Sequence, residues 1–430
     1  MLRRDLFRSF FGFVLSSVNL GANSAIVGDS AGFRVLWFDF IGQMSSYRFD
    51  QEGGERVLRA LAYVRSYHAG MPGGGGYFEL VPEKGEVDWG KRFPSNVQGY
   101  HWQRVGGVGQ VNVEDYGATG DGVTDDSDAF HRAIHSGANS VVIPPARVAY
   151  IVGGVPLPTG ITISGIGYRR VYSPSGPENY GGRLPLIHLA PRAHHVFLPS
   201  GLNTIQRLSL WGRRDTDVFG RGDMNGITFE DVSVANFRYG FGSAGAYWRN
   251  SRFTRCHATK CVVGLGSAVD SHFISCEINA NDVGIEMLRG ANDNTFMGTK
   301  CEWNSLNWRF VGARNVTIVG GVTDRAVGRF GFEIRDSEVA ISGSVIRRNG
   351  RAGDGAHFKC AGDGLLLLSS VIVRSGADDH GRSVQLAPVA CFDLLDASGN
   401  FRLTVSACDF DERSVRCVGD NQGRSVCFSH

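Results

Sequence analysis

Two sets of acidic residues in this 430-residue sequence have the types and spacing that chemistry requires. One is the run EDYGATGDGVTDDSDAFHRAI, residues 114–134, in which five Asp and three Gly lie close together. The other is the pair Glu302 and Asp324, in the second half of the chain. Crowded carboxylates can bind a metal ion, and a pair of them can act as the acid and the base or nucleophile that cleave a glycosidic bond. Which chemistry applies depends on the elements that carry these residues.

An internal repeat in the second half of the chain organises the second set. The segments FEDVSVANFRYGF, FTRCHATKCVVGL and FISCEINANDVGI align without gaps and begin at Phe229, Phe253 and Phe273. The starts are 24 and 20 residues apart, and Phe296 follows 23 residues later. A unit of this length has room for three short strands and no helix. It cannot bury a core by itself and must therefore stack on its neighbours.

Stacked units of this kind predict a parallel β-helix, in which equivalent residues of successive coils lie directly over one another. The four Phe residues then form one interior column, and Val232, Cys256 and Cys276 form another. All nine Cys lie between residues 256 and 427, and no CxxC pair occurs among them. This favours small, reduced core residues over disulfides or metal ligands as the role of the Cys.

The same alignment predicts a candidate site on the outside of the coils. It places Glu302, Asp324 and Arg347 in one row, and Trp303 beside Arg325 in the next row. We predict that Glu302 and Asp324 are the catalytic acid and base or nucleophile, since two carboxylates about 5 Å apart suit a retaining glycosidase and about 6.5–9.5 Å an inverting one. The alternative is a solvated surface ladder in which Asp324 and Arg347 form a salt bridge. The residues predicted to contact the substrate are Arg347, Arg325, Trp303, Trp308 and Glu277.

Other polar residues in the coils have simpler interpretations. Asn281 aligns with Asn304, and the pair predicts a ladder of amide side chains that stabilises a turn. His257 and His272 are possible bases, but a lone His on a strand is usually a surface residue, which is the favoured interpretation. The excursion GRRDTDVFGRGD, residues 212–223, contains three Asp that could wall a groove or bind calcium, but an ordinary loop is the simpler prediction.

Composition excludes several classes of function. The 44 Lys and Arg nearly balance 42 Asp and Glu, giving a net charge of +2, whereas nucleic-acid and membrane-surface proteins need a strong basic excess. No segment has the length of apolar sequence that spans a membrane. No cofactor and no metal site is predicted. The 59 Gly in a strand-forming background indicate many tight turns between short strands.

The acidic run at residues 114–134 is predicted to be structural rather than catalytic. Its Gly residues allow a turn, and Asp125, Asp126 or Ser127 can cap a helix that begins near Asp128. Such a helix would cover the first coil of the β-helix, whose apolar end and strand edges need protection. The predicted organisation is a signal-like or anchoring segment at 1–25, a lead-in at 26–110, the β-helix at 111–400 and a C-terminal coil or cap at 401–430.

Two predictions concern the N-terminal part. Residues 1–25 contain Arg3 and Arg4, a short apolar stretch and small residues, which is the plan of an export signal. A helix docked on the protein or on a partner remains an equal alternative. The apolar spacing of Val57, Leu58 and Leu61 predicts a second helix over residues 55–67.

The motifs YGATGDGVTDDSDAF, SVVIPPARVAYIVGG and ITISGIG resemble the entry signature and first coils of the pectate-lyase-like superfamily. The preceding segment, YHAGMPGGGGYFELV, is similar to the lead-in of phage tailspike and capsule-depolymerase proteins on this fold. The resemblance implies an all-β protein, a right-handed single-stranded parallel β-helix with an N-terminal capping helix. It also implies a bacterial surface or extracellular polysaccharide as substrate, a homotrimer, and a virion-tail or secreted location.

The superfamily includes several reaction types, so the resemblance leaves the reaction open. We expect depolymerisation by glycosidic hydrolysis. A polysaccharide lyase that acts by β-elimination is the enzymatic alternative, and a glycan-binding adhesin or structural fibre is the alternative without catalysis.

Overall fold

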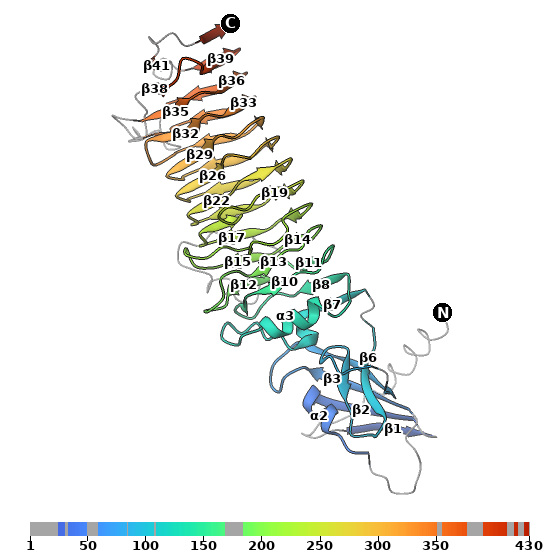
Figure 1. Cartoon of the computed structure of the whole chain (residues 1–430). Helices are drawn as coiled ribbons and strands as arrows, with labels where there is room; N and C mark the ends of the chain where they lie inside the picture. Colours follow the sequence, from blue (N-terminus) through green and yellow to red (C-terminus); the bar gives the residue numbers. More distant parts are fainter. Residues whose placement is uncertain are drawn as a thin grey trace. The chain divides into compact units, whose positions relative to one another are not determined.

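The computed structural model describes residues 25–30, 33–49, 59–83, 85–106, 109–167, 184–350, 355–375, 390–410, 417–419 and 425–429. Figure 1 shows the chain coloured along its sequence. The chain divides into two compact units. The first contains the residues up to Thr119 together with Asp128–Val142, and the second contains Gly120–Ser127 and the residues from Ile143 onward. The predicted signal-like segment at 1–25 lies almost entirely outside the described residues.

The first unit is built on a six-stranded sheet in the order β1-β2-β3-β4-β6-β5. Strands β2 and β3 are parallel, and the other neighbours are antiparallel. The elements of this sheet and its helix are β1 (Ala25–Ser30), β2 (Phe33–Phe40), α2 (Ile41–Ser46), β3 (Arg59–Ser66), β4 (Gly74–Pro82), β5 (Arg92–Pro94) and β6 (Tyr100–Arg104).

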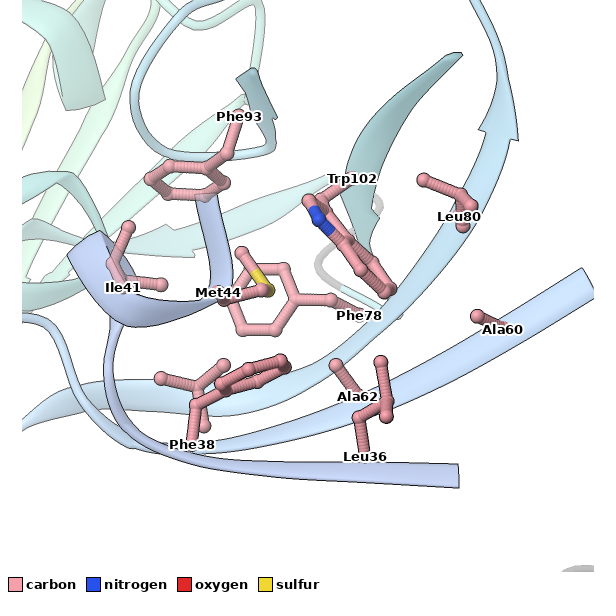
Figure 2. Packing of buried hydrophobic residues seen from close by; sticks show 11 residues of the cluster. Leu36, Phe38, Ile41, Met44, Ala60, Ala62, Phe78, Leu80, Phe93 and Trp102 are labelled. Atoms are coloured by element: carbon pink, nitrogen blue, oxygen red, sulfur yellow. The ribbon is translucent and has the colours of Figure 1, made fainter. Parts of the chain in front are cut away.

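One face of this sheet packs against α2 and forms a core of its own. Figure 2 shows Met44 of the helix lying among Phe38, Phe78, Phe93 and Trp102, all of which are buried. Aromatic rings of this size remove large apolar areas from water. The unit therefore has its own apolar stabilisation.

Residues 55–58 of the helix predicted over residues 55–67 lie outside the described residues. In the described part the prediction is wrong, because Arg59–Ser66 forms strand β3. Ala60, Ala62 and Val64 alternate on the core face and are buried, with a period of two rather than 3.6. The residues between them, Leu61 and Tyr63, are also apolar and so hide this alternation in the sequence. Further along the lead-in, Tyr77 and Glu79 lie in strand β4.

The acidic run of residues 114–134 forms a 3₁₀ helix, a turn and α3 (Ser127–Ile134), the helix that the sequence predicts. The Asp121 carboxylate accepts hydrogen bonds from the backbone N–H groups of Val123 and Thr124, at 2.8 and 2.7 Å. The buried Asp126 accepts one from Gly120 N–H at 3.2 Å. These carboxylates serve the backbone, in agreement with the structural interpretation. The neighbouring elements of the first unit are η1 (Val113–Tyr116) and the parallel strands β7 (Gln110–Asn112) and β8 (Ser140–Ile143).

The second unit is a right-handed parallel β-helix, as the sequence predicts, whose stacked coils run from green to red in Figure 1. Each coil contributes one strand to each of up to three parallel sheets. The first sheet contains β11 (Thr162–Gly165), β14 (Thr204–Gln206), β16 (Thr228–Glu230), β20 (Arg252–Thr254), β24 (His272–Ile274), β27 (Thr295–Met297), β30 (Val316–Val319), β33 (Glu338–Ser342), β36 (Leu365–Ser369), β39 (Arg402–Ser406) and β42 (Ser425–Ser429).

The second sheet carries the candidate site. Its strands are β9 (Tyr150–Val152), β12 (Leu186–Leu189), β15 (Ser209–Trp211), β17 (Ser233–Ala235), β21 (His257–Thr259), β25 (Glu277–Asn279), β28 (Lys300–Glu302), β31 (Val322–Asp324), β34 (Val345–Arg347), β37 (Ile372–Arg374) and β40 (Asp409–Phe410).

The third sheet has fewer strands. They are β18 (Tyr239–Phe241), β22 (Val263–Leu265), β26 (Val283–Met287), β29 (Leu306–Val311), β32 (Phe330–Arg335), β35 (Ala356–Gly362), β38 (Ala390–Ala397) and β41 (Cys417–Val418). Two short pairs complete the unit: β10 (Val155–Pro156) with β13 (Phe197–Leu198), and β19 (Trp248–Arg249) with β23 (Ala268–Val269). All three sheets continue beyond residue 400, where the sequence analysis places a closing segment.

The predicted Phe column is confirmed inside the first sheet. The rings of Phe229, Phe253, Phe273 and Phe296 stack in sequence, with centroids 4.9, 4.7 and 4.5 Å apart. Each strand pair is in the register that the repeat predicts. The spacing equals the distance between neighbouring strands, so the column is continuous from coil to coil.

The Cys residues whose side chains the structure describes are free thiols, and six of the eight are buried. Cys256 and Cys276 lie in the interior column with Val232. Burial raises the pKa of the Cys256 thiol well above its ordinary value, so the group stays protonated and behaves as a small apolar residue. This agrees with the predicted role as core residues.

A second interior ladder stabilises the turn that follows the second sheet. Asn281 donates from its side-chain amide to Asn304 Oδ1 at 2.9 Å, and its backbone N–H donates to the same oxygen at 2.8 Å. Asn304 donates onward to Asn307, and Asn307 donates to Asn349, both at 2.8 Å. The predicted amide ladder is confirmed, and it is longer than the sequence analysis expected.

Candidate functional site

The outward side chains of the second sheet form two parallel rows. The first and third residues of each short strand point outward, while the middle residue is buried. The third positions of β25, β28, β31 and β34 give the row Asn279, Glu302, Asp324 and Arg347, in direct register. The predicted row is therefore confirmed in its order and pairing.

Glu302 is accessible at the surface of this row. Its side chain is 15% exposed, and its carboxylate lies 3.5 Å from Lys300 Nζ on the same strand. The alternation of β28, with Cys301 buried between them, directs both side chains outward. Glu302 can therefore contact a bound polymer.

Asp324 is predicted from the sequence to be a catalytic group at the surface like Glu302, but its side chain is 0% exposed. Its carboxylate accepts hydrogen bonds from Arg325 Nη1 at 2.9 Å, Arg347 Nε at 3.1 Å and Arg348 Nε at 2.9 Å, and Arg348 Nη2 also contacts it. Enclosed by three guanidinium groups, it has no surface from which to act on a substrate. The prediction of a catalytic acid, base or nucleophile at Asp324 is corrected to that of a residue that positions Arg347.

Trp303 offers an aromatic surface next to Glu302. Its side chain is 48% exposed, and the guanidinium of Arg325 lies 4.6 Å from the ring centroid. Arg325 is itself buried and bonded to Asp324. The indole is thus supported from one side by a cation–π contact. The predicted contact between positions 303 and 325 is confirmed.

Trp308 is not a surface residue, and the prediction that it contacts substrate is wrong. Its ring is buried and stacks on Phe332, with centroids 5.8 Å apart, while Nε1 donates to Thr323 Oγ1 at 2.9 Å. The position aligns with Ile285 of the preceding coil, which is also buried. Trp308 belongs to the interior column.

Arg347 and Arg374 occupy neighbouring coils of the same row but differ in their contacts. The Arg347 side chain is 40% exposed and donates to Asp324 from Nε. The Arg374 side chain is 36% exposed, and its two terminal nitrogens donate to the Asp409 carboxylate, to Asp409 C=O at 2.9 Å and to Val373 C=O at 3.0 Å. Arg374 is a residue of this row that the sequence analysis missed, although extending the column by one coil would have found it.

Glu277 supplies a second carboxylate on the same face as Glu302. It lies in register with Lys300, so it is one strand and two residues from Glu302. A strand spacing of about 4.8 Å and a rise of about 6.6 Å over two residues give a Cα separation of about 8 Å. Lys300, which the sequence analysis did not select, is the register partner of Glu277 and lies 3.5 Å from the Glu302 carboxylate.

The third sheet carries a charged ladder that the sequence analysis also missed. Arg309 lies between Glu286 and Glu333, at 3.2 and 3.1 Å, and Tyr239 donates to Glu286 at 3.2 Å. Burial and the nearby Glu286 raise the pKa of Tyr239 to about 12. The pKa of Arg309 is also raised, because its two carboxylate partners outweigh the effect of burial. All the charged groups are paired, which is typical of a stabilising ladder.

The excursion at residues 212–223 behaves as a loop tied to the coils. Arg214 forms an ion pair with Asp282, and the buried Asp217 accepts two hydrogen bonds from Arg238, both at 2.9 Å. Among the described residues, no group of three or more His, Cys, Asp or Glu could hold a metal ion. In the part of the chain that the structure describes, no helix has the length and apolarity to cross a membrane.

Comparison with known proteins identifies relatives of the fold. Residues 110–167 match the family model described as Rhamnogalacturonase A/epimerase, pectate lyase-like. A glucan 1,3-beta-glucosidase from Cochliobolus carbonum is 41% identical over 68 residues, which are 13% of this chain and 9% of that protein. Both similarities are local, since they cover a small part of the chain.

Solved tailspike structures are similar over most of the chain. Full-length tailspike protein 2 of the Escherichia coli O157:H7 bacteriophage CAB120 has a TM-score of 0.61 at 15% identity, covering 86% of this chain and 52% of that one. Tailspike protein gp49 of Acinetobacter baumannii bacteriophage Fri1, a capsular polysaccharide depolymerase, has a TM-score of 0.51 at 11% identity, covering 89% and 75%.

The chain spans about half the length of the first of these tailspikes. At such identities the similarity concerns the fold. The predicted resemblance is confirmed at the level of the fold: the chain shares the right-handed parallel β-helix, and residues 110–167 match the pectate-lyase-like family model.

Proposed function

We propose that this protein depolymerises a bacterial surface or extracellular polysaccharide by glycosidic hydrolysis on the outer face of the second sheet. The observation that carries the proposal is the presence of two outward carboxylates, Glu302 and Glu277, on the face that also bears the exposed ring of Trp303. A long, regular face suits an extended polymer better than a small metabolite. Aromatic rings next to carboxylates suit the apolar faces of sugars.

The two carboxylates can divide the work of hydrolysis. A Cα separation of about 8 Å allows the two flexible Glu side chains to hold their carboxyl groups about 6.5–9.5 Å apart, which is the spacing in inverting glycosidases. One carboxyl group would protonate the leaving oxygen. The other would remove a proton from the attacking water on the opposite side of the sugar ring. Asp324 would act only through the arginine residues that it holds.

The comparisons support activity on a glycan without deciding the reaction. Gp49 of phage Fri1 is a capsular polysaccharide depolymerase, and the Cochliobolus protein is a glucosidase. By the same likeness to tailspikes, we propose a virion-tail or extracellular location and a homotrimer, which sedimentation of the purified chain tests directly. Sequencing the N-terminus of the mature protein distinguishes an exported protein, which would have lost its first residues, from a virion component.

The experiment is incubation with a panel of capsular polysaccharides and lipopolysaccharides, followed by mass analysis of the products. Hydrolysis adds one water to each broken bond, whereas β-elimination leaves an unsaturated uronate that absorbs ultraviolet light. Glu302→Gln and Glu277→Gln should each lower kcat by at least about a hundredfold, as expected when a proton-transfer group is removed. Glu230→Gln is the matched control, because Glu230 is a paired surface carboxylate on the first sheet.

Three results would contradict the proposal. Full activity in both site variants would exclude this face. An ultraviolet-absorbing product would replace hydrolysis by a lyase reaction. Binding of a polymer whose length stays unchanged after long incubation would indicate an adhesin.

A further inference from the structure

We propose that Arg347 binds an anionic group on the glycan and so makes the site selective for acidic polymers. The inference rests on the proposed function and adds the chemical class of the substrate. A carboxylate, sulfate or phosphate substituent would satisfy the same guanidinium.

The contacts of Arg347 leave part of its guanidinium directed to solvent. Among the described residues, its ion pair is with Asp324, made through Nε at 3.1 Å. The side chain is 40% exposed, and its hydrogen bond to Asp324 uses Nε rather than the two terminal nitrogens. A guanidinium fixed through Nε presents its remaining N–H groups as a planar fork, which matches the two oxygens of a carboxylate.

The carboxylate that fixes Arg347 is shared. Asp324 also accepts hydrogen bonds from Arg325 and from Arg348, both of which are buried. The Asp324 carboxylate is thus divided among three guanidinium groups, of which that of Arg347 is the most exposed. Arg347 keeps positive charge at the surface while its orientation is fixed from below.

Arg374, one coil further along the row, is an arginine whose terminal nitrogens are already hydrogen-bonded to the protein. Its terminal nitrogens donate to the Asp409 carboxylate and to two backbone carbonyl groups. The side chain has nearly the same exposure as that of Arg347, 36% against 40%. The difference lies in the partners, because the outward fork of Arg374 is already occupied by the protein.

The position of Arg347 suits a substrate group close to the cleaved bond. It lies two coils from Glu302 in the same row, about 10 Å along the stacking direction. Trp303 lies beside this row, on the coil that carries Glu302. A polymer lying along the face would place a charged substituent on Arg347 while a neighbouring sugar lies over Trp303 and Glu302.

The test compares one acidic polysaccharide that the protein cleaves with the same polymer after chemical reduction of its carboxyl groups. For the wild type, kcat/KM should fall at least tenfold on reduction, which corresponds to about 1.4 kcal/mol. Arg347→Gln should lose a similar factor on the acidic polymer and show no difference between the two forms. Arg374→Gln, the matched control, should stay within twofold of the wild type. Sulfated and phosphorylated neutral glycans show which anion is preferred.

Each result decides the inference separately from the proposed function. Equal cleavage of the acidic and reduced polymers by the wild type would overturn the inference and leave hydrolysis intact. If no polymer is cleaved, the hydrolase proposal fails, and binding of the same two polymers decides the inference alone. Equal binding of both, or binding of neither, would overturn it. Circular dichroism of Arg347→Gln verifies that the variant is folded.

Discussion

The buried cluster around Asp324 predicts a large stability change for a single-atom substitution. Asp324→Asn keeps the shape of the side chain but removes a negative charge that Arg325, Arg347 and Arg348 all contact. Arg347 is partly exposed, so its guanidinium group can be hydrated. Those of Arg325 and Arg348 cannot be, because both residues are buried. The variant therefore leaves two buried guanidinium groups without the carboxylate that they share.

The expected magnitude follows from this burial. Removal of one partner of a buried ion pair costs about 3–5 kcal/mol, because it leaves a buried charge without compensation. Asparagine keeps an oxygen that can accept one hydrogen bond, so we expect the lower part of this range. Asp409→Asn is the control, since it removes the carboxylate of an exposed pair with Arg374 and should change the free energy of unfolding by about 0–1 kcal/mol.

The assay is chemical unfolding followed by tryptophan fluorescence and circular dichroism, with the wild type, both single variants and a double variant. The double variant Asp324→Asn/Arg348→Met also removes one of the two buried guanidinium groups that contact Asp324. It should be more stable than the sum of the two single changes predicts, because the charges are coupled. The assignment of Asp324 as the centre of the cluster would be refuted by either of two results. One is that Asp324→Asn is as stable as Asp409→Asn, and the other is that the two changes in the double variant are strictly additive.

Two further predictions concern the exposed aromatic residue and the charged ladder of the third sheet. Trp303→Ala should lower kcat/KM by about tenfold, equivalent to about 1.4 kcal/mol, and leave the melting temperature nearly unchanged; Trp89→Ala, which removes an exposed tryptophan of the first unit, should leave activity unchanged. Because the folded-state pKa of Tyr239 is raised from 10.0 to about 12, the folded state holds this proton more tightly than the unfolded chain. Its contribution to stability is present below pH 10 and is lost between pH 10 and 12. The free energy of unfolding of the wild type should therefore fall between pH 9 and pH 11.5 by more than that of Tyr239→Phe. An identical loss would show that Tyr239 contributes nothing to this dependence.

The arrangement of the coils could be predicted from the sequence because a β-helix repeats its register. Once Phe229, Phe253 and Phe273 were aligned, every other residue of those coils acquired a neighbour. The pairing of Glu302 with Asp324 and of Asp324 with Arg347 followed from the same offsets, and the strand registers confirm both. Neighbours along the stacking direction are thus encoded in sequence spacing alone.

Depth below the surface could not be predicted in the same way. Asp324 occupies an outward strand position, yet it is buried because the arginines at the following turn position, Arg325 and Arg348, direct their guanidinium groups onto it. This depends on side-chain conformations across three coils rather than on register. Trp308 is a different case, since its alignment with the buried Ile285 would have placed it in the core if the column had been followed.

The turn after the second sheet explains how such a site can be built without changing the fold. Ala280, Trp303, Arg325 and Arg348 all occupy this position in successive coils and all have φ between 50° and 59°. The backbone N–H of each of these residues donates to a carbonyl group of the next coil, whatever its side chain is. Because backbone hydrogen bonds hold the left-handed conformation, the identity of the side chain at this position is not constrained by the fold. An alanine, an exposed tryptophan and two buried arginines therefore occupy one column with nearly the same backbone φ, and the chemical character of this face is set by its side chains.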